Sequence, residues 1–397
     1  MFRRIAVTMV IFSLAVSSAG CWGKTELNEI GIVTVTGVDY DPDGSIRITV
    51  MSVQPEGPAN TAPVRSSTWI GTATGKNLMD ASKNLRSIAV KDLTWIHNSV
   101  IVIGKAAAQQ KMNEVIDFFS RNREVRFNSY ILVADGTAFD MMQIPPDIQS
   151  DLSKEILGMI DNVDEWSKSY VANAKEFLVS HTDNCGNYVT GRLAQSKESR
   201  TTFSAPRENY EKMALLGKDI PLAYIEGCAV FRQGKMIGWL DSVETRGYLW
   251  ITGKIMSGSI ITEMDGGTVS MENNFSSTSV ELKPVNGELT AHIKVDTRGT
   301  LVEQTTSHEL KKEEAINDIE QKIAGEITKE MKTAVKKAQD EYKTDIFRIG
   351  GKLHKEYPEL WRQLGSDWDD TGFPKVKFSY SVNVTVERTG KLLKRVY

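Results

Sequence analysis

A single apolar stripe through residues 308–347 constrains the fold of this chain more than any other stretch of its sequence. Apolar residues recur there at steps of three or four, with Lys and Glu at most positions between them. One buried face is typical of a helix packed on a sheet. The spacing drifts above the 3.5-residue repeat of a coiled coil, which disfavours that structure. The stripe consists of Ile316, Ile319, Ile323, Ile327, Met331, Val335, Ala338, Tyr342 and Ile346.

The sheet for this helix is expected on both sides of it in the chain. Apolar and polar residues alternate without a break over residues 376–386, and residues 289–295 alternate in the same way. Strict alternation predicts strands with one buried face. Several short strands are expected from Ile255 onwards. Residues 255–397 are therefore predicted to form a C-terminal α+β domain.

The N-terminal part alternates between predicted strands and helices. Residues 30–38 and 46–50 are rich in β-branched residues and flank the turn sequence Asp41-Pro42-Asp43-Gly44, which predicts a β-hairpin. This order predicts an α/β domain over residues 21–195. Further strands are expected at 67–72, 98–104 and 128–136, and helices at 74–89, 106–121 and within 151–179.

A polar segment, residues 181–208, is predicted to be a linker. A small middle α+β domain, residues 196–254, is expected next, with strands at 209–216, 222–231 and 236–240 and a helix at 241–254. The predicted class for the whole chain is α+β, with three units of mixed sheet packed with helices.

The first twenty-one residues have the pattern of an export signal. Arg3 and Arg4 precede an apolar run, residues 5–16, that is too short to span a bilayer, and small residues lead to Cys21. A cysteine at this exit is typical of a bacterial lipoprotein, in which the thiol receives a diacylglycerol. Residues 1–20 are thus predicted to be the signal and Cys21 the lipidated N-terminus, with the body on the extracytoplasmic face of a membrane. Ser18 stands where such signals usually carry leucine, and an ordinary secretory signal or an uncleaved anchor are the alternatives.

Charge and cysteine content narrow the function classes. The chain of 397 residues has a formal net charge of −3, and loss of the two signal arginines makes the remainder more acidic, which argues against nucleic-acid binding. No run of eighteen apolar residues follows Cys21, so the body is expected to be held to the membrane by its lipid. Cys185 and Cys228 are too few for a disulfide framework, and Cys228 is expected to be a buried free thiol.

Two loops resemble ligand motifs without completing them. Residues 39–44 match the opening of a calcium loop, but Val50 stands where the bidentate carboxylate is needed. Residues 71–77 resemble a phosphate loop that is one residue short and ends on Asn77, so a helix start is the simpler interpretation. A hairpin turn explains the first motif equally well.

No catalytic constellation is predicted. His308-Glu309 lacks the second histidine of a zinc helix because Lys312 occupies that position, and no G-x-S-x-G motif occurs. His97 beside Asn98 is expected to be a structural pair. The chain is therefore not predicted to be an enzyme, and neither a metal ion nor a cofactor is expected.

Taken together, the sequence resembles the C-subunit lipoproteins of bacterial spore germinant receptors, the Ger(x)C family. The matching residues follow the family's order through most of the chain, although Ile349-Gly350-Gly351 has an additional glycine. They are Cys21-Trp22, Glu26-Leu27-Asn28-Glu29-Ile30, Thr36-Gly37-Val38-Asp39, Gly227-Cys228-Ala229-Val230-Phe231, Gly238-Trp239-Leu240, Glu244-Thr245-Arg246-Gly247, Asp345-Ile346-Phe347, Gly350, His354, Tyr357-Pro358, Trp361, Trp368 and Thr389-Gly390.

The resemblance implies a non-catalytic, lipid-anchored subunit of a nutrient receptor in the spore inner membrane. Its implied partners are the multi-spanning A subunit and the transporter-like B subunit, and its implied role is in receptor assembly and in triggering germination. An extracytoplasmic solute-binding lipoprotein of an import system is the alternative, but it should have two similar α/β lobes.

Two predictions concern contacts of the body. Trp361, Trp368 and Phe373 lie in a loop-rich stretch, where they either cap the core of the C-terminal domain or are exposed and dock the membrane subunits. No cluster of paired charges in a cleft is evident, so direct nutrient binding by this chain is not predicted.

Overall fold

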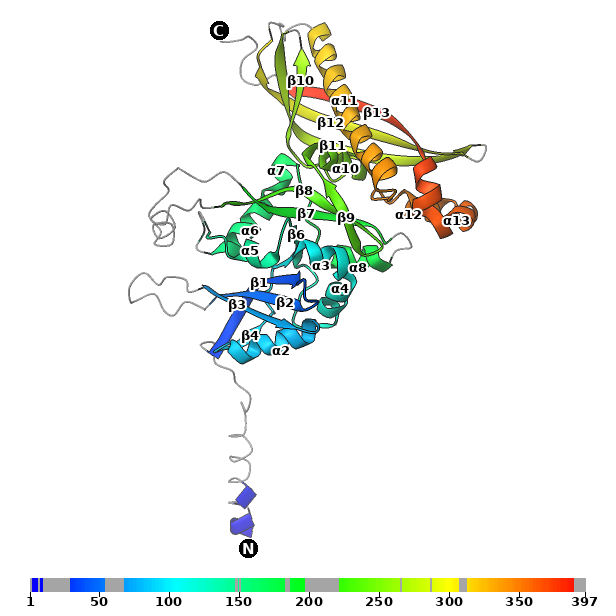
Figure 1. Ribbon diagram of the computed structural model, residues 1–397. Helices are drawn as coiled ribbons and strands as arrows, with labels where there is room; N and C mark the ends of the chain where they lie inside the picture. The colour runs from blue at the N-terminus through cyan, green and yellow to red at the C-terminus, as the bar shows by residue number, and fades with distance from the viewer. Residues whose placement is uncertain are drawn as a thin grey trace.

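The described residues form two β-sheets, one of nine strands and one of four (Figure 1). The structure is a computed structural model. The predicted α+β class is confirmed, because both sheets carry packed helices. The residues that the structure describes are 2–5, 8–9, 29–53, 68–146, 149, 151–182, 186–196, 221–264, 266–285, 288–306 and 313–388.

The nine-stranded sheet has a parallel centre and antiparallel flanks. Its order is β3-β2-β1-β5-β6-β7-β8-β9, and β4 pairs with β1. Strands β1, β5, β6 and β7 run parallel, while β2 and β3 on one side and β8 and β9 on the other are antiparallel to their neighbours. The strands are β1 (Ile30–Tyr40), β2 (Ile46–Val53), β3 (Thr68–Gly75), β4 (Asp92–Thr94), β5 (Val100–Ile103), β6 (Tyr130–Ala134), β7 (Tyr188–Gln195), β8 (Ala223–Arg232) and β9 (Lys235–Leu240).

Side-chain alternation along the central strands gives this sheet a core on each face. In β5, Ile101 and Ile103 pack with α2, α3, α4 and α8, whereas Val100 and Val102 pack with α5 and α6. All four side chains are at most 1% exposed. The helices are α2 (Leu78–Ile88), α3 (Lys105–Gln110), α4 (Met112–Arg121), α5 (Ala138–Met142), α6 (Leu152–Asp161), α7 (Val163–Trp166) and α8 (Ala174–Thr182).

Two predictions for this region are wrong. The helix expected at 106–121 is divided at Lys111 into α3 and α4. The linker expected at 181–208 contains β7, which is buried between β6 and β8. The strand expected at 209–216 and Cys185 lie outside the described residues. The hairpin of β1 and β2 is confirmed.

The second sheet has the order β10-β11-β12-β13. Its first three strands are antiparallel, but β13 pairs in parallel with β12. The short strands expected here are wrong in length, because β11 has 19 residues and β12 has 17. The strands are β10 (Ser259–Met264), β11 (Gly267–Val285), β12 (Glu288–Gln304) and β13 (Lys377–Arg388).

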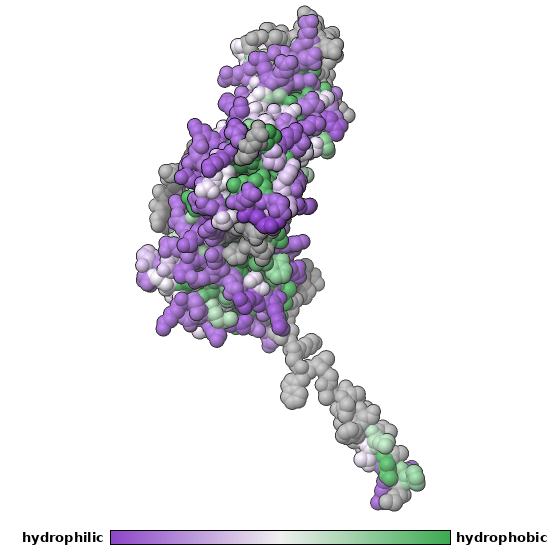
Figure 2. All heavy atoms as spheres, turned by 90° about the vertical axis from the view of Figure 1, so that its right-hand side faces the viewer, coloured by the Kyte–Doolittle hydropathy of each residue, from purple (hydrophilic) through white to green (hydrophobic). Residues whose placement is uncertain are grey.

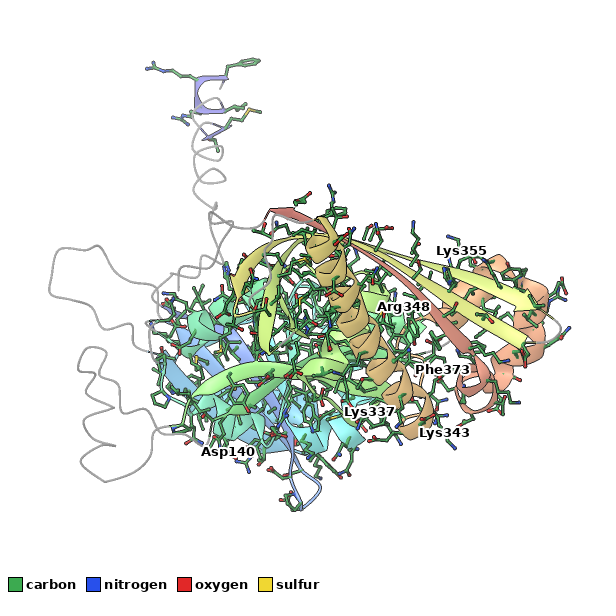
Figure 3. The ribbon with its side chains drawn as sticks, turned by 90° about the horizontal axis from the view of Figure 1, so that it is seen from above. Asp140, Lys337, Lys343, Arg348, Lys355 and Phe373 are labelled. Carbon is green, nitrogen blue, oxygen red and sulfur yellow. The ribbon has the colours of Figure 1, made fainter. Side chains whose placement is uncertain are left out.

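Helix α11 (Glu313–Lys336) carries the apolar stripe and crosses this sheet (Figure 3). Ile319, Ile323, Ile327 and Met331 are each 0% exposed, which confirms the predicted buried face. The helix does not continue to 347 as predicted. It passes into a π-helical turn, η2 (Lys337–Glu341), and the chain then leaves the helix through Lys343, whose φ is 47°.

Helix α10 (Ser242–Thr252) lies between the two sheets and packs against α11. The Arg246 guanidinium contacts the Glu330 carboxylate at 2.9 Å, and the Trp250 indole donates to the same carboxylate at 2.8 Å. A Cβ on Gly247 would overlap the Glu330 carbonyl and lie 2.7 Å from the Ala334 Cβ, so glycine permits this close approach. Glu244 completes a capping box with Asp241 at the start of α10.

The predicted middle unit does not form a sheet of its own among the described residues. Its strands β8 and β9 extend the nine-stranded sheet, whereas its helix α10 joins the core of the four-stranded sheet. That core also includes Val189 of β7 and Cys228 and Val230 of β8. One continuous apolar core therefore links the two sheets. The predicted domain boundaries, between residues 195 and 196 and between residues 254 and 255, stay a prediction.

Short helices close the C-terminal part. They are α12 (Ile349–Glu356), α13 (Pro358–Leu364), the 3-10 turns η3 (Gly365–Asp367) and η5 (Phe373–Lys375), and the π-helical turn η4 (Trp368–Gly372). Figure 2 shows one face of the whole molecule, on which hydrophilic residues predominate and smaller apolar areas lie between them.

Candidate functional site

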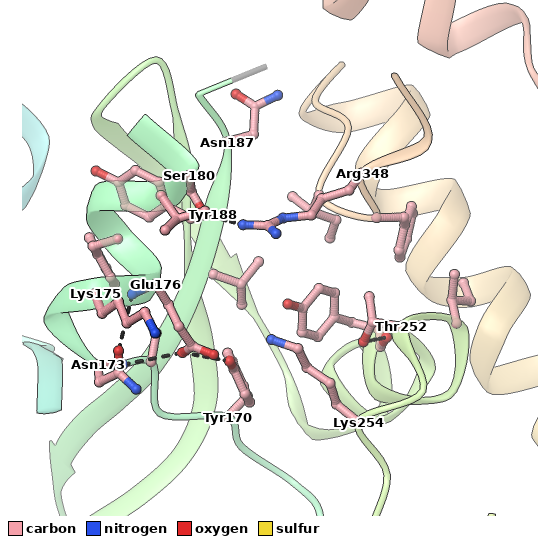
Figure 4. A pocket seen from close by; sticks show the side chains of 18 of the residues that line it. Tyr170, Asn173, Lys175, Glu176, Ser180, Asn187, Tyr188, Thr252, Lys254 and Arg348 are labelled. Atoms are coloured by element: carbon pink, nitrogen blue, oxygen red, sulfur yellow. Dashed lines mark hydrogen bonds between the residues drawn. The ribbon is translucent and has the colours of Figure 1, made fainter. Parts of the chain in front are cut away.

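A pocket of about 580 Å³ lies where α8, the start of β7, the end of α10 and residues 346–348 meet (Figure 4). It is bordered by both sheets, since Tyr188 belongs to the first and Val280 to the second. Ligand sites commonly occupy roughly 300–1,000 Å³ and favour such junctions. This pocket is the candidate functional site.

Charged side chains enter the pocket from three separate elements. Glu176 comes from α8, Lys254 follows α10, and Arg348 precedes α12. The Arg348 guanidinium donates to the Ser180 hydroxyl. In Figure 4, Lys254 and Arg348 come from one side and point toward α8 and β7. Lys175 adds a third cation at the exposed edge.

Local hydrogen bonds fix the carboxylate of Glu176. Its Oε2 accepts from the Tyr170 hydroxyl at 2.7 Å and from the Asn173 backbone N–H at 3.3 Å. The Asn173 side chain in turn accepts from the Glu176 N–H at 3.0 Å. This reciprocal pair is a capping box at the start of α8. Glu176 thus has a structural role in addition to its place in the pocket wall.

Lys254 is the perturbed base of the site. Burial, together with the nearby charge of Arg348, lowers the pKa of its ammonium to about 8, while Glu176 opposes the shift. The Nζ lies 3.6 Å from the centre of the Tyr170 ring, a cation–π contact. Burial also raises the pKa of the Tyr170 and Tyr248 hydroxyls. The phenols therefore stay neutral, and Glu176 is the one carboxylate among the described residues that line the pocket.

The inner wall of the pocket is apolar and includes two aromatic rings that are almost fully buried, Tyr188 and Phe347. Behind it, the Cys228 thiol is 0% exposed, and burial raises its pKa to about 11. Cys228 is a free cysteine, as predicted. A buried, protonated thiol is a poor nucleophile, so the role of Cys228 is to pack in the core.

The carboxyl group of Asp345 positions the segment that carries Phe347 and Arg348. It accepts hydrogen bonds from the backbone N–H groups of Phe347, Ile349 and Gly350 at 3.1, 3.1 and 2.6 Å. It also accepts from the Trp368 indole at 2.9 Å. Burial raises the pKa of Asp345, and these donors oppose that shift. The network holds Arg348 in a left-handed conformation, with φ of 62°, at the pocket edge.

A second carboxylate connects this segment to the first sheet. Asp369 accepts from the Asp345 backbone N–H at 2.9 Å and from the Asn187 side chain at 2.8 and 2.9 Å. Asn187 directly precedes β7. These hydrogen bonds therefore fix the segment that carries Arg348 relative to the nine-stranded sheet.

The aromatic residues proposed for docking are buried instead. Trp361, Trp368 and Phe373 are 8, 4 and 0% exposed. Their rings contact one another in sequence, with centroids 5.6 and 6.4 Å apart, and His354 stacks on Trp361 at 5.5 Å. This burial agrees with the alternative that they cap the core, and their docking to the membrane subunits stays a prediction. Cys21 lies outside the described residues, so its lipidation stays a prediction.

The acidic residues of the hairpin turn point to separate partners. Asp39 accepts from the Ala138 and Phe139 N–H groups at 2.7 and 2.9 Å, Asp41 pairs with Arg47 at 2.7 Å, and Asp43 accepts from the Ser45 N–H at 2.9 Å. Asn77 caps α2, as the helix-start interpretation predicted. Within the described ranges, no group of three His, Cys, Asp or Glu side chains is arranged to hold a metal ion.

Sequence reasoning missed the pocket. The expectation that no paired charges share a cleft is wrong, because Glu176, Lys254 and Arg348 line one pocket. These residues are far apart in the chain, and no local pattern links them. One sequence feature did indicate this region: the family-matching residues Asp345-Ile346-Phe347 directly precede Arg348.

Comparison with known proteins places this fold in a class. The family described as spore germination protein N-terminal domain matches residues 23–194, and the family described as spore germination B3/GerAC-like, C-terminal, matches residues 226–390. The fold is thus that of spore germination proteins. The chain belongs to the Ger(x)C family.

Curated relatives align with the chain over nearly its whole length. Spore germination protein B3 of Bacillus subtilis (strain 168) is 24% identical over 392 residues, which cover 96% of this chain and 97% of the relative. Spore germination protein KC of the same organism is 23% identical over 403 residues, 98% of this chain and 97% of the relative. The crystal structure of the GerBC protein has a similar fold, with a TM-score of 0.58 and 19% identity, over 89% of this chain and 96% of that one.

Among the residues that the structure describes, none forms a helix with the length and apolar content needed to span a membrane.

Proposed function

We propose that this chain is the lipid-anchored, non-catalytic subunit of a nutrient germinant receptor, acting in receptor assembly and in triggering spore germination. The observation that carries the proposal is the full-length match to spore germination proteins in both parts of the chain. The signal pattern that ends at Cys21 supports the anchor and an extracytoplasmic position at the spore inner membrane. The proposed partners are the membrane-embedded A and B subunits.

The fold does not favour the alternative of a solute-binding lipoprotein of an importer. Such a protein should contain two similar α/β lobes, whereas the two sheets here differ in strand number and direction. The nine-stranded sheet has a parallel centre, and the four-stranded sheet is mostly antiparallel.

Deletion and complementation in the native spore-former test the proposal. Spores that lack the chain should fail to release dipicolinate with the nutrients of its receptor, and the wild-type gene should restore release. Cys21→Ala should move the protein from the membrane to the soluble fraction and abolish complementation, whereas the control Cys185→Ala should do neither.

A second measurement separates the anchor from receptor membership. Affinity-tagged wild-type chain should recover the A and B subunits from detergent-solubilised spore membranes. Normal germination of the deletion strain with every nutrient, or absence of both subunits from the purified material, would contradict the proposal. Retention of Cys21→Ala in the membrane in wild-type amount would contradict only the lipid anchor.

A further inference from the structure

Three features of the pocket described above point to a ligand of defined chemistry. The first is its charge, since the Lys254 ammonium, in a cation–π contact with the Tyr170 ring, faces the pocket alongside Arg348 and Lys175. The second is that Glu176 is already hydrogen-bonded to the Tyr170 hydroxyl and to the backbone of Asn173. Among the described residues that line the pocket, Glu176 supplies the one carboxylate, and the Lys254 ammonium carries a positive charge into the pocket. An anionic group is the complement of this lining.

The third feature is the separation of polar and apolar walls. Tyr188, Tyr248 and Phe347 are 5, 5 and 7% exposed, so the pocket reaches core residues of the protein. Lys254 and Arg348 come from one side of this space and point across it (Figure 4). A ligand with a charged end and an apolar body would satisfy both kinds of wall at once.

We propose that this pocket binds a small carboxylate with an apolar body, its carboxylate held by Lys254 with Arg348 at the edge. The apolar body packs against Tyr188, Tyr248 and Phe347. The capping role of Glu176 argues against a simple amine as ligand, because its carboxylate already accepts two hydrogen bonds. Ligand binding in this pocket does not depend on whether the chain belongs to a germinant receptor. A negative result for one proposal therefore leaves the other unaffected.

Protonation of Lys254 follows from this assignment. Its ammonium is faced by Tyr170 and Tyr248, by Arg348, and by the Glu176 carboxylate, with the Cys228 thiol behind. A bound carboxylate favours the charged form and raises the pKa of Lys254. Binding should therefore take up a proton near pH 8, and affinity should fall as the pH rises above that value.

Isothermal titration of the full chain in lipid nanodiscs tests the site with three matched probes. Leucine carries both charged groups, 4-methylpentanoate lacks the amine, and 3-methylbutylamine lacks the carboxylate. Both carboxylates should bind saturably at one site, and the amine should not. At pH 7, Lys254→Met should weaken carboxylate binding at least about tenfold, while Lys235→Met, at an exposed position of β9 outside the pocket, should leave it unchanged.

Wild-type protein provides a readout that does not depend on folding of the variant. The heat of binding near pH 8 should differ between buffers of different ionisation enthalpy, as proton uptake requires. No saturable heat with either carboxylate, equal binding of the amine, or unchanged affinity in a folded Lys254→Met protein would each overturn the proposal.

Discussion

Asp345→Asn is expected to destabilise the segment that positions Phe347 and Arg348. Each carboxylate oxygen of Asp345 accepts two hydrogen bonds. One oxygen receives the Phe347 and Ile349 N–H groups, and the other receives the Gly350 N–H and the Trp368 indole. Asparagine retains one oxygen and turns an NH₂ group toward the other pair of donors. Two buried donors then lose their acceptor.

The magnitude follows from those two donors. An unsatisfied buried donor costs about 1–3 kcal/mol, so the loss of two acceptors should lower the free energy of unfolding by roughly 2–6 kcal/mol. Asp345 is 0% exposed, which leaves little access for water to replace the lost acceptor. Asp340→Asn, at an exposed position of η2, is the matched control and should change stability by less than about 0.5 kcal/mol.

Two assays separate a local from a global effect. Urea unfolding gives the change for the whole protein, and amide hydrogen exchange of residues 345–353 reports the segment itself. Exchange there should quicken about tenfold for each 1.4 kcal/mol lost. A cost under about 1 kcal/mol, with exchange unchanged, would refute the reasoning, because it would mean that an uncharged group satisfies these donors equally well.

Further predictions concern four other positions. Gly247→Ala should destabilise the protein by more than about 2 kcal/mol in urea unfolding because its Cβ would overlap α11. Gly325→Ala should instead stabilise the protein by about 0.5–1 kcal/mol, because no atom lies within 4 Å of the new Cβ. Trp368→Ala should lower the free energy of unfolding by about 3–5 kcal/mol, since the residue is 4% exposed. A loss below about 1 kcal/mol would contradict the burial of this ring. For Lys254, the pKa of about 8 in the folded state lies below the ordinary 10.5. Below pH 8 the buried ammonium is charged, and its burial lowers the free energy of unfolding by the full amount. That cost is relieved between pH 8 and 10.5, and the stability of the wild type relative to Lys254→Met should rise over that window by up to about 3 kcal/mol in urea titrations.

Local periodicity accounts for the parts of the fold that the sequence predicted. The stripe of α11 and the alternation of β13 depend on burial of one face, which is written in neighbouring residues. Strand β7 escaped prediction because Gly191 and Arg192 interrupt its apolar pattern and polar residues precede it. Its strand conformation comes from pairing with β6 and β8, and so from residues distant in the chain.

The pocket was beyond sequence reasoning for a related reason. The side chains of Glu176, Lys254 and Arg348 belong to three elements, and their convergence depends on how the two sheets share a core. The motif around Asp345 was visible, but its role was not. Only the structure shows that its carboxyl group organises backbone N–H groups rather than a substrate.

The parallel pairing of β12 with β13 sets an order of events during folding. Helix α11 and the short helices separate these strands along the chain, so residues 377–388 must be synthesised and available before the second sheet is complete. Until then the inner face of β12 and the stripe of α11 lack part of their cover. Pairings between distant segments form slowly, and uncovered apolar strands are prone to aggregation. The time at which β13 arrives, rather than the strength of any one contact, should therefore limit the yield of native protein.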